Sequence, residues 1–236
     1  MIYRLQILIR FAIIILVMVT LAVSGDCQSQ NEDNAEFHLA TVLKVIPPVQ
    51  VRHFDTEEFA ELKQDDLIFP GDRIVCSDGG YAALLFSDSA VELKLFPNSE
   101  LTLQGQSGED GFLKRLFLPV GILWTKLFRG NLEVITPTSV ASVKGTEWWT
   151  IVESTSQTRV VVIVGEVEVK HRITGISERA AENTTAITTP SGEIDLTPTE
   201  EFIPPKIPSV EKNQTLEIEL EDSTGQKKTI IIKYSE

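Results

Sequence analysis

Few residues in this chain have the types and spacing that catalysis or metal binding requires. The three histidines, His38, His53 and His171, are far apart, so a metal site built from them needs long-range convergence. None belongs to an H-x-H or H-E-x-x-H pattern, and we expect each to be solvated at a strand edge. The adjacent acids Glu57-Glu58 and Asp65-Asp66 point to opposite faces of an extended chain, which favours a solvated surface.

Motifs of nucleotide-binding and acyl-transfer enzymes are absent from the sequence. The chain has no G-x-S-x-G elbow, no P-loop and no dinucleotide-binding fingerprint. We therefore predict a protein with no catalytic residues, no cofactor and no metal. An enzyme with two carboxylates that meet across strands stays open as a minor alternative.

Aromatic residues form the concentration best suited to binding a ligand or partner. Trp148 and Trp149 are neighbours, so in a strand one ring is expected in the core and the other partly exposed on the opposite face. An exposed tryptophan on a sheet is a platform for a sugar or a partner protein, although packing beneath a loop explains it as well. The predicted binding surface consists of Trp124, Phe128, Trp148 and Trp149.

The elements that position these residues are predicted to be strands. From Phe69 onward, apolar and polar residues alternate in short runs separated by turns. This spacing predicts an all-β fold of many short, mostly antiparallel strands, rolled into a sandwich, barrel or solenoid. We expect a loop at 105–111, then one strand at 112–120 and another at 122–127. For residues 55–67, an extended chain and a single helical turn both stay open.

Residues 135–169 carry the most distinctive pattern and predict three consecutive strands. Gly145 inside a strand lowers stability unless the backbone bulges or another segment approaches closely. Pro137 cannot donate to a sheet ladder, so we expect it at a strand end or edge. With Gly165, which interrupts a run of valines, these residues are predicted to be structural.

Three blocks of residues, in order over about half of the chain, resemble the FecR domain family. The matching residues are Gly71 and Asp72 at a turn; Tyr81, Ala82, Ala83, Leu85, Phe86 and Asp88; Thr136, Pro137, Val143, Gly145, Thr146 and Glu147; and Val164, Gly165, Val167 and Val169. The resemblance implies a FecR-type β domain over 37–200. It also implies the extracytoplasmic module alone, because the few residues before the N-terminal apolar run leave no room for the family's cytoplasmic sigma-factor-binding part.

The N-terminus predicts export from a bacterial cell. Residues 1–24 join Arg4 and Arg10 to an apolar run followed by small residues, which is the pattern of a cleaved secretory signal peptide. Arg10 leaves this run shorter than the about 20 apolar residues of a membrane anchor. We expect a periplasmic or secreted cell-envelope protein with a flexible mature terminus at 25–36 and no stable membrane span after cleavage. An uncleaved anchor is the alternative.

The two cysteines give a weaker indication. Cys76 lies where a half-buried strand meets a turn, and we expect a small core thiol there. A disulfide with Cys27 is allowed in an oxidising compartment and stays open.

A formal net charge of −13 at pH 7 limits the partners. An acidic surface repels phosphate groups, so we expect no binding to nucleic acid or to an anionic membrane surface. Hydrophobic residues make up 42% of the chain, which suffices for a core and excludes global disorder.

Beyond the predicted domain, residues 201–210 are proline-rich and predict a stiff, extended linker. Residues 211–236 predict a β-hairpin in which Glu217 and Glu219 face lysines of the second arm. An isolated hairpin is marginally stable, so we expect it to dock on the domain or on a partner.

Two function classes follow from these observations. The first is a noncatalytic envelope module that binds or holds a protein or glycan through the surface near the tryptophans or through the hairpin. The alternative is a signalling component related to FecR-type regulators, acting through a separate membrane partner. The identity of the partner and the oligomeric state are not encoded in any motif.

Overall fold

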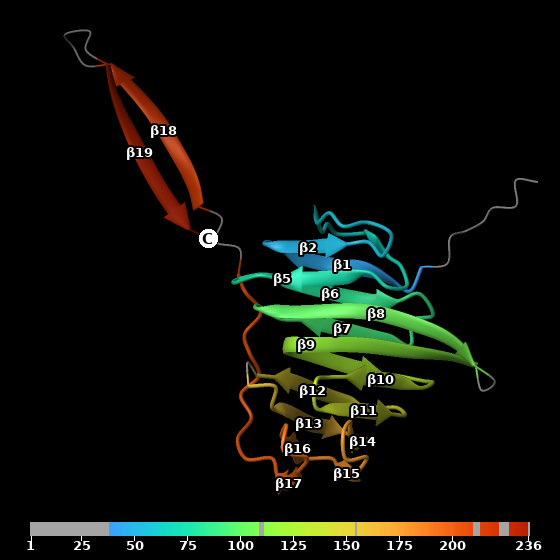
Figure 1. Ribbon diagram of the computed structural model, residues 1–236. Coiled ribbons are helices and arrows are strands. Elements are labelled where there is room, and N and C mark those ends of the chain that lie inside the picture. Colours follow the sequence, from blue (N-terminus) through green and yellow to red (C-terminus); the bar gives the residue numbers. More distant parts are fainter. Residues whose placement is uncertain (1–37, 109–110, 154, 210–212, 222–226, 236) are drawn as a thin grey trace, which may run out of the picture. The chain divides into compact units, whose positions relative to one another are not determined.

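The described part of the chain is built from strands (Figure 1). One of them, β9, belongs to two layers. The structure is a computed structural model that describes residues 38–108, 111–153, 155–209, 213–221 and 227–235. Seventeen strands form one continuous mixed sheet, and two more form a separate hairpin. The predicted all-β class is confirmed. The predicted leader, the terminus at 25–36 and Cys27 lie outside the described residues.

The continuous sheet folds into two layers that lie face to face. The first layer contains, in spatial order, β4 (Leu67–Ile68), β1 (Ala40–Ile46), β6 (Tyr81–Phe86), β7 (Val91–Leu95), the second half of β9 (Gly111–Leu127), β12 (Glu147–Val152), β13 (Thr158–Val164), β16 (Thr184–Thr188) and β17 (Ile194–Pro198). The second layer contains β3 (Ala60–Glu61), β2 (Val49–Arg52), β5 (Arg73–Cys76), β8 (Ser99–Gly108), the first half of β9, β10 (Leu132–Ile135), β11 (Ser139–Val143), β14 (Glu166–His171) and β15 (Ser177–Ala181). Among the described strands, neighbours are antiparallel except β9 and β10, which are parallel.

The core lies between the two layers. Alternate side chains of both layers point inward and form one apolar cluster, in which Leu84, Leu116, Val134 and Trp148 are 0% exposed. Burying this apolar surface is the main source of stability in such a sandwich. The period-two alternation of the sequence is therefore the pattern of one buried face and one outer face.

β9 changes layer at Gly121, so the prediction of two strands separated there is wrong. It is one strand of 17 residues, paired first with β8 and then with β7 and β12. Gly121 has a φ of 107°, and a Cβ at this position would collide with Ser99. The predicted loop at 105–111 is also wrong, because the ladder of β8 and β9 continues to Gly108 and Gly111. Glycine, which usually marks a loop, here allows a bend within one strand.

Residues 135–169 contain four strands after β10, not the predicted three, because the chain changes layer twice. Gly145, with a φ of 73°, leads from β11 in the second layer to β12 in the first. Gly165, with a φ of 90°, leads back from β13 to β14. A Cβ on Gly165 would lie 3.1 Å from the carbonyl oxygen of Gly145, and Thr146 Oγ donates to the carbonyl of Glu166 at 3.0 Å. The two crossings thus contact each other and hold the layers in register.

The C-terminal residues form the predicted hairpin, with β18 (Asn213–Glu221) antiparallel to β19 (Lys227–Ser235). The predicted Glu–Lys oppositions are wrong, because the register places Glu217 opposite Ile231 and Glu219 opposite Thr229. A one-residue difference in register changes every cross-strand pair, and charge pattern alone does not set it.

Residues 55–67 contain the short strand β3, turns on both sides of it and no helix. Among the described residues, no helix is long and apolar enough to cross a membrane.

Candidate binding surfaces

The predicted aromatic group is divided between the two faces of the first layer. Trp148 points into the core, whereas Trp149 points outward, directly beside Trp124 of β9. The expectation that the neighbouring rings lie on opposite faces is confirmed. The expected partial exposure of one ring is wrong, because Trp149 is only 7% exposed and Trp124 only 8%.

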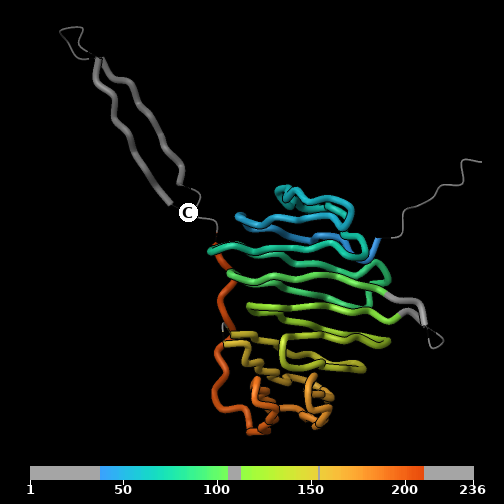
Figure 2. Tube along the Cα trace, viewed as in Figure 1, coloured from blue at the N-terminus to red at the C-terminus, as the bar shows by residue number. Residues whose placement is uncertain are grey.

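A segment from the C-terminal part of the chain covers the outward aromatic rings. Residues 199–209, called the covering segment below, leave β17 and run past the ends of first-layer strands (Figure 2). Its Phe202 ring lies 5.5 Å from the Trp149 ring, and Phe96 lies 5.2 Å from the same ring. Lys94 Nζ lies 3.9 Å above the Trp124 ring, a cation–π contact. The outer face of the first layer is thus an apolar cluster covered by its own chain.

Glu147 connects Trp124 to the end of β9. Its Oε1 accepts a hydrogen bond from Trp124 Nε1 at 3.3 Å, and its Oε2 lies 3.0 Å from Lys126 Nζ. Lys126 in turn lies 5.5 Å from the ring of Phe128, which is 56% exposed. Phe128 is therefore the member of the predicted group that presents most of its ring to solvent, and a binding role for the group stays a prediction.

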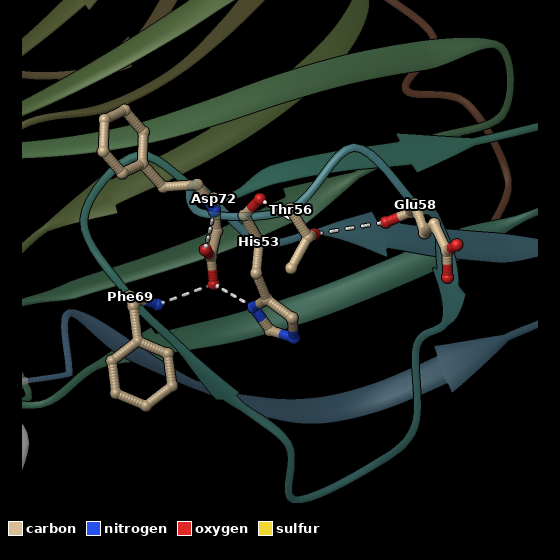
Figure 3. Close-up of polar contacts among 6 residues, drawn as sticks. His53, Thr56, Glu58, Phe69 and Asp72 are labelled. Atoms are coloured by element: carbon tan, nitrogen blue, oxygen red, sulfur yellow. Dashed lines mark hydrogen bonds and ion pairs between the residues drawn. The ribbon is translucent and has the colours of Figure 1, made fainter.

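His53 and Asp72 form the closest approach to a catalytic pair in the described residues (Figure 3). His53 Nδ1 lies 2.9 Å from Asp72 Oδ2, and the buried Asp72 also accepts hydrogen bonds from the backbone N–H groups of Phe54 and Phe69. The hydroxyl of Thr56 donates to the carbonyls of His53 and Glu58, so it is not aligned as a nucleophile on the imidazole. This arrangement joins the loop after β2 to the turn before β5.

His171 is fully buried, so the prediction that it is solvated is wrong. Its Nδ1 accepts from the backbone N–H groups of Ile173 and Thr174, and its Nε2 lies 3.0 Å from the carbonyl oxygen of Thr189. Both ring nitrogens are therefore used to close the loop after β14. Sequence alone does not reveal this, because the partners are backbone groups of a second loop.

Thr136 of the Thr136–Pro137 motif belongs to a cluster of buried threonine hydroxyls. Thr136 and Thr138 from the corner between β10 and β11 are buried against Thr158 of β13 and Thr188 of β16, and these Oγ atoms hydrogen-bond one another over 2.8–3.1 Å. Pro137 lies in the turn, outside any strand, as predicted. The sequence shows the threonines but not that they converge.

Arg172 Nη1 fixes the same corner, because it donates to the carbonyls of Thr136 at 3.0 Å and Pro137 at 3.4 Å.

Cys76 is confirmed as a core thiol: it is 1% exposed, and burial raises its pKa to about 12.

An ion pair joins the two layers at one end of the core. Lys114, from the second-layer half of β9, places Nζ 2.7 Å from Asp88 Oδ2 in the turn between β6 and β7. Burial would raise the pKa of Asp88, but hydrogen bonds from Lys114 and the Ala90 N–H and the charges of Lys114 and Arg129 lower it below its ordinary value. Asp88 is therefore held as the carboxylate.

The outer face of the second layer is open and carries charged side chains. Two adjoining depressions of about 460 and 530 Å³ lie across β9, β10, β11, β14 and β15 and share Glu133, Ser142 and Glu168. The charged side chains that line this combined surface, called the second-layer groove below, are Arg115, Lys144, Lys170, Arg172, Arg179, Glu133, Glu166 and Glu168. Half-buried Ile135 and Val140 lie opposite each other in its floor.

The groove charges are partly neutralised. Arg115 Nε lies 2.8 Å from Glu133 Oε2, and Arg179 pairs more loosely with Glu166 at 3.8 Å. Lys144 and Lys170 are exposed and form no ion pair with another described side chain. The alternation of Glu166, Glu168 and Lys170 along β14 was a visible signal for an outer face, although nothing local indicated which strands adjoin it.

Metal-binding geometry is not found in the part of the chain that the structure describes, where no three His, Cys, Asp or Glu side chains gather at one point.

Comparison with known proteins returns a distant structural likeness. No family model and no curated protein matches the chain. Two crystal structures, at 1.65 and 2.50 Å resolution, of "a putative anti-sigma factor from Parabacteroides distasonis ATCC 8503" resemble it with a TM-score of 0.46 and 17% sequence identity. The match covers 53% of this chain and 59% of the other.

Proposed function

We propose that this chain is a noncatalytic, exported envelope protein with a FecR-like β domain that binds a protein or glycan partner through the second-layer groove. The single observation that carries this proposal is the difference in cover between the two outer faces. The aromatic outer face of the first layer packs against Phe202, whereas the groove combines half-buried apolar side chains with exposed charges. Binding surfaces typically combine such an apolar floor with polar groups that set specificity.

The residues at the family-like positions support a scaffold role. Gly145, Thr146 and Gly165 hold the crossings between layers, and Asp72 joins two loops. Residues used in this way stabilise the fold and leave the open face free to vary in chemistry.

A pull-down from the envelope fraction of the producing cells tests the proposal. The full chain is compared with a variant that reverses two groove charges, Lys144→Glu with Lys170→Glu. The matched control, Lys44→Glu with Lys206→Glu, makes the same change in net charge at exposed positions of β1 and the covering segment. We expect the groove variant to lose a partner that the wild type and the control retain, and co-sedimentation with purified peptidoglycan identifies a glycan partner.

Phe128→Ala is a third arm of the same experiment, because this ring is the most exposed part of the predicted aromatic group. Loss of the partner in this variant alone would move the binding site to the first layer. Equal recovery from all variants, with no binding to peptidoglycan, would overturn the proposal.

The signalling alternative needs a membrane connection. Mass spectrometry of the mature N-terminus separates the two functions: a start near Gly25 supports the exported binding module, whereas an intact Met1 supports signalling through the membrane.

A further inference from the structure

The acidic residues of the described domain are most concentrated in the segment that connects β2 to β4. Residues 55–66 contain six acids, Asp55, Glu57, Glu58, Glu61, Asp65 and Asp66, and a single base, Lys63. All of these side chains are exposed except Asp66, which is half-buried. This stretch, called the acidic segment below, projects a strong negative charge from one edge of the sheet.

The acidic segment also carries an apolar group. Phe59 is 42% exposed, and its ring lies about 6 Å from the guanidinium carbons of Arg52 and Arg73. These contacts hold the aromatic ring at the surface among the acids. An aromatic group inside a charged rim is the usual composition of an interaction hot spot.

The second-layer groove has the complementary composition. Five cationic side chains and three acidic ones line it, an excess of positive charge on a chain whose net charge is −13. Arg115 and Arg179 are paired with acids, so Lys144, Lys170 and Arg172 supply the excess over the remaining acid, Glu168, which accepts a hydrogen bond from Ser177. Ile135 and Val140 supply an apolar floor for an aromatic ring.

The acidic segment and the groove lysines are far apart within one molecule. The acidic segment contains β3, the strand at one edge of the second layer, whereas Lys170 is on β14 and Lys144 follows β11, nearer the other edge. Between β3 and β14 lie β2, β5, β8, β9, β10 and β11. With neighbouring strands about 4.8 Å apart, Lys170 is separated from the acidic segment by tens of ångströms.

We propose that the second-layer groove binds the acidic segment of a second copy of this chain, so that copies associate head to tail. This inference rests on the proposed function of the groove as a binding face and names its partner. The contact joins two different surfaces, so it leaves a free groove at one end and a free acidic segment at the other, and association continues into short linear chains.

Sedimentation velocity of the purified chain, over a concentration series and at low and high salt, measures this association. We expect reversible oligomers that dissociate as NaCl rises from about 50 to 500 mM, because salt screens charges separated by more than a few ångströms. Reversal of the groove charges (Lys144→Glu, Lys170→Glu) or of the segment charges (Glu57→Lys, Glu58→Lys) should each weaken association by about tenfold or more. The controls Lys44→Glu/Lys206→Glu and Glu182→Lys/Glu200→Lys, which repeat the charge changes elsewhere, should associate like the wild type.

Two further samples identify the contact as head to tail. Mixing the groove variant with the segment variant makes both contacts complementary again, native groove with native segment and reversed groove with reversed segment, so the mixture should form oligomers in which the two variants alternate. The chain that carries all four substitutions should associate again, because both partners of the contact are reversed.

The two proposals fail in different ways. A wild type that stays monomeric at every concentration and salt, or variants that associate as the wild type does, would overturn head-to-tail association. If the groove variant still lost an envelope partner that the wild type and the control retain, the pull-down would support the proposed function. If the chain associates with itself but captures no partner in the pull-down, self-association is the role of the groove.

Discussion

The outer faces of the two layers differ in how they meet water, since one is covered by another segment of the chain and the other is open. The first layer carries Trp124, Trp149, Tyr81 and Phe96 outward, and Phe202 from the covering segment packs against this cluster at Trp149. The second layer carries charged side chains outward and leaves them in water. Aromatic surface is costly to hydrate and requires a cover, whereas charges are costly to bury and require none. The charged face therefore stays open, whereas the aromatic face, which the sequence suggested as a binding surface, is covered.

The largest expected effect is on the covered face. Trp149→Ala should lower the free energy of unfolding by about 3–5 kcal/mol, because it removes a buried ring that contacts Phe96 and Phe202. Urea denaturation measures the loss. Ile203→Ala is the control, since Ile203 is 77% exposed. A loss no larger than that of the control would mean that the first-layer face is not packed as described.

The cover itself is tested by Phe202→Ala. We expect a loss of about 1–3 kcal/mol, smaller than for Trp149 because Phe202 is only half-buried. Tryptophan emission should shift to longer wavelength as water reaches Trp149, and binding of a hydrophobic dye should rise. Unchanged emission would show that another part of the chain covers the ring.

A pH series probes the connection between the layers. The lowered pKa of Asp88 means that its carboxylate stabilises the fold above the unfolded-state value of about 3.9. This stabilisation disappears as pH falls through the lower pKa of the folded state. The melting temperature of Asp88→Asn should therefore lie below that of the wild type near neutral pH, and the two should converge in strong acid. A difference independent of pH would exclude the carboxylate as its source.

The smallest expected effect is on the open face. Lys170→Ala should change the free energy of unfolding by less than about 0.5 kcal/mol, because the side chain is exposed and forms no ion pair with another described residue. Thermal and urea unfolding check this. A loss comparable with that of Phe202→Ala would remove the contrast between the two faces.

Local patterns predicted much of the fold. Alternation along Val91–Leu95 and Glu166–His171 correctly indicated one buried and one outer face. The adjacency of Trp148 and Trp149 correctly placed their rings on opposite faces. Glycines were misread more often, because the same residue marks a loop, a bend within β9 at Gly121 or a layer crossing at Gly145. Only the distant strand that approaches each glycine distinguishes these cases.

The sequence by itself determined the all-β class, the C-terminal hairpin and the acidic character, because alternation, turn residues and charge act over a few neighbouring positions or over composition. The tertiary structure decided which outward residues are covered. Trp149 is buried by Phe202 and His171 by the loop at Thr189, contacts between segments far apart in the chain. The second-layer groove likewise exists only because β9, β10, β11, β14 and β15 lie side by side. Long-range contacts of this kind leave no local pattern, so sequence predicted the faces and the fold determined their exposure.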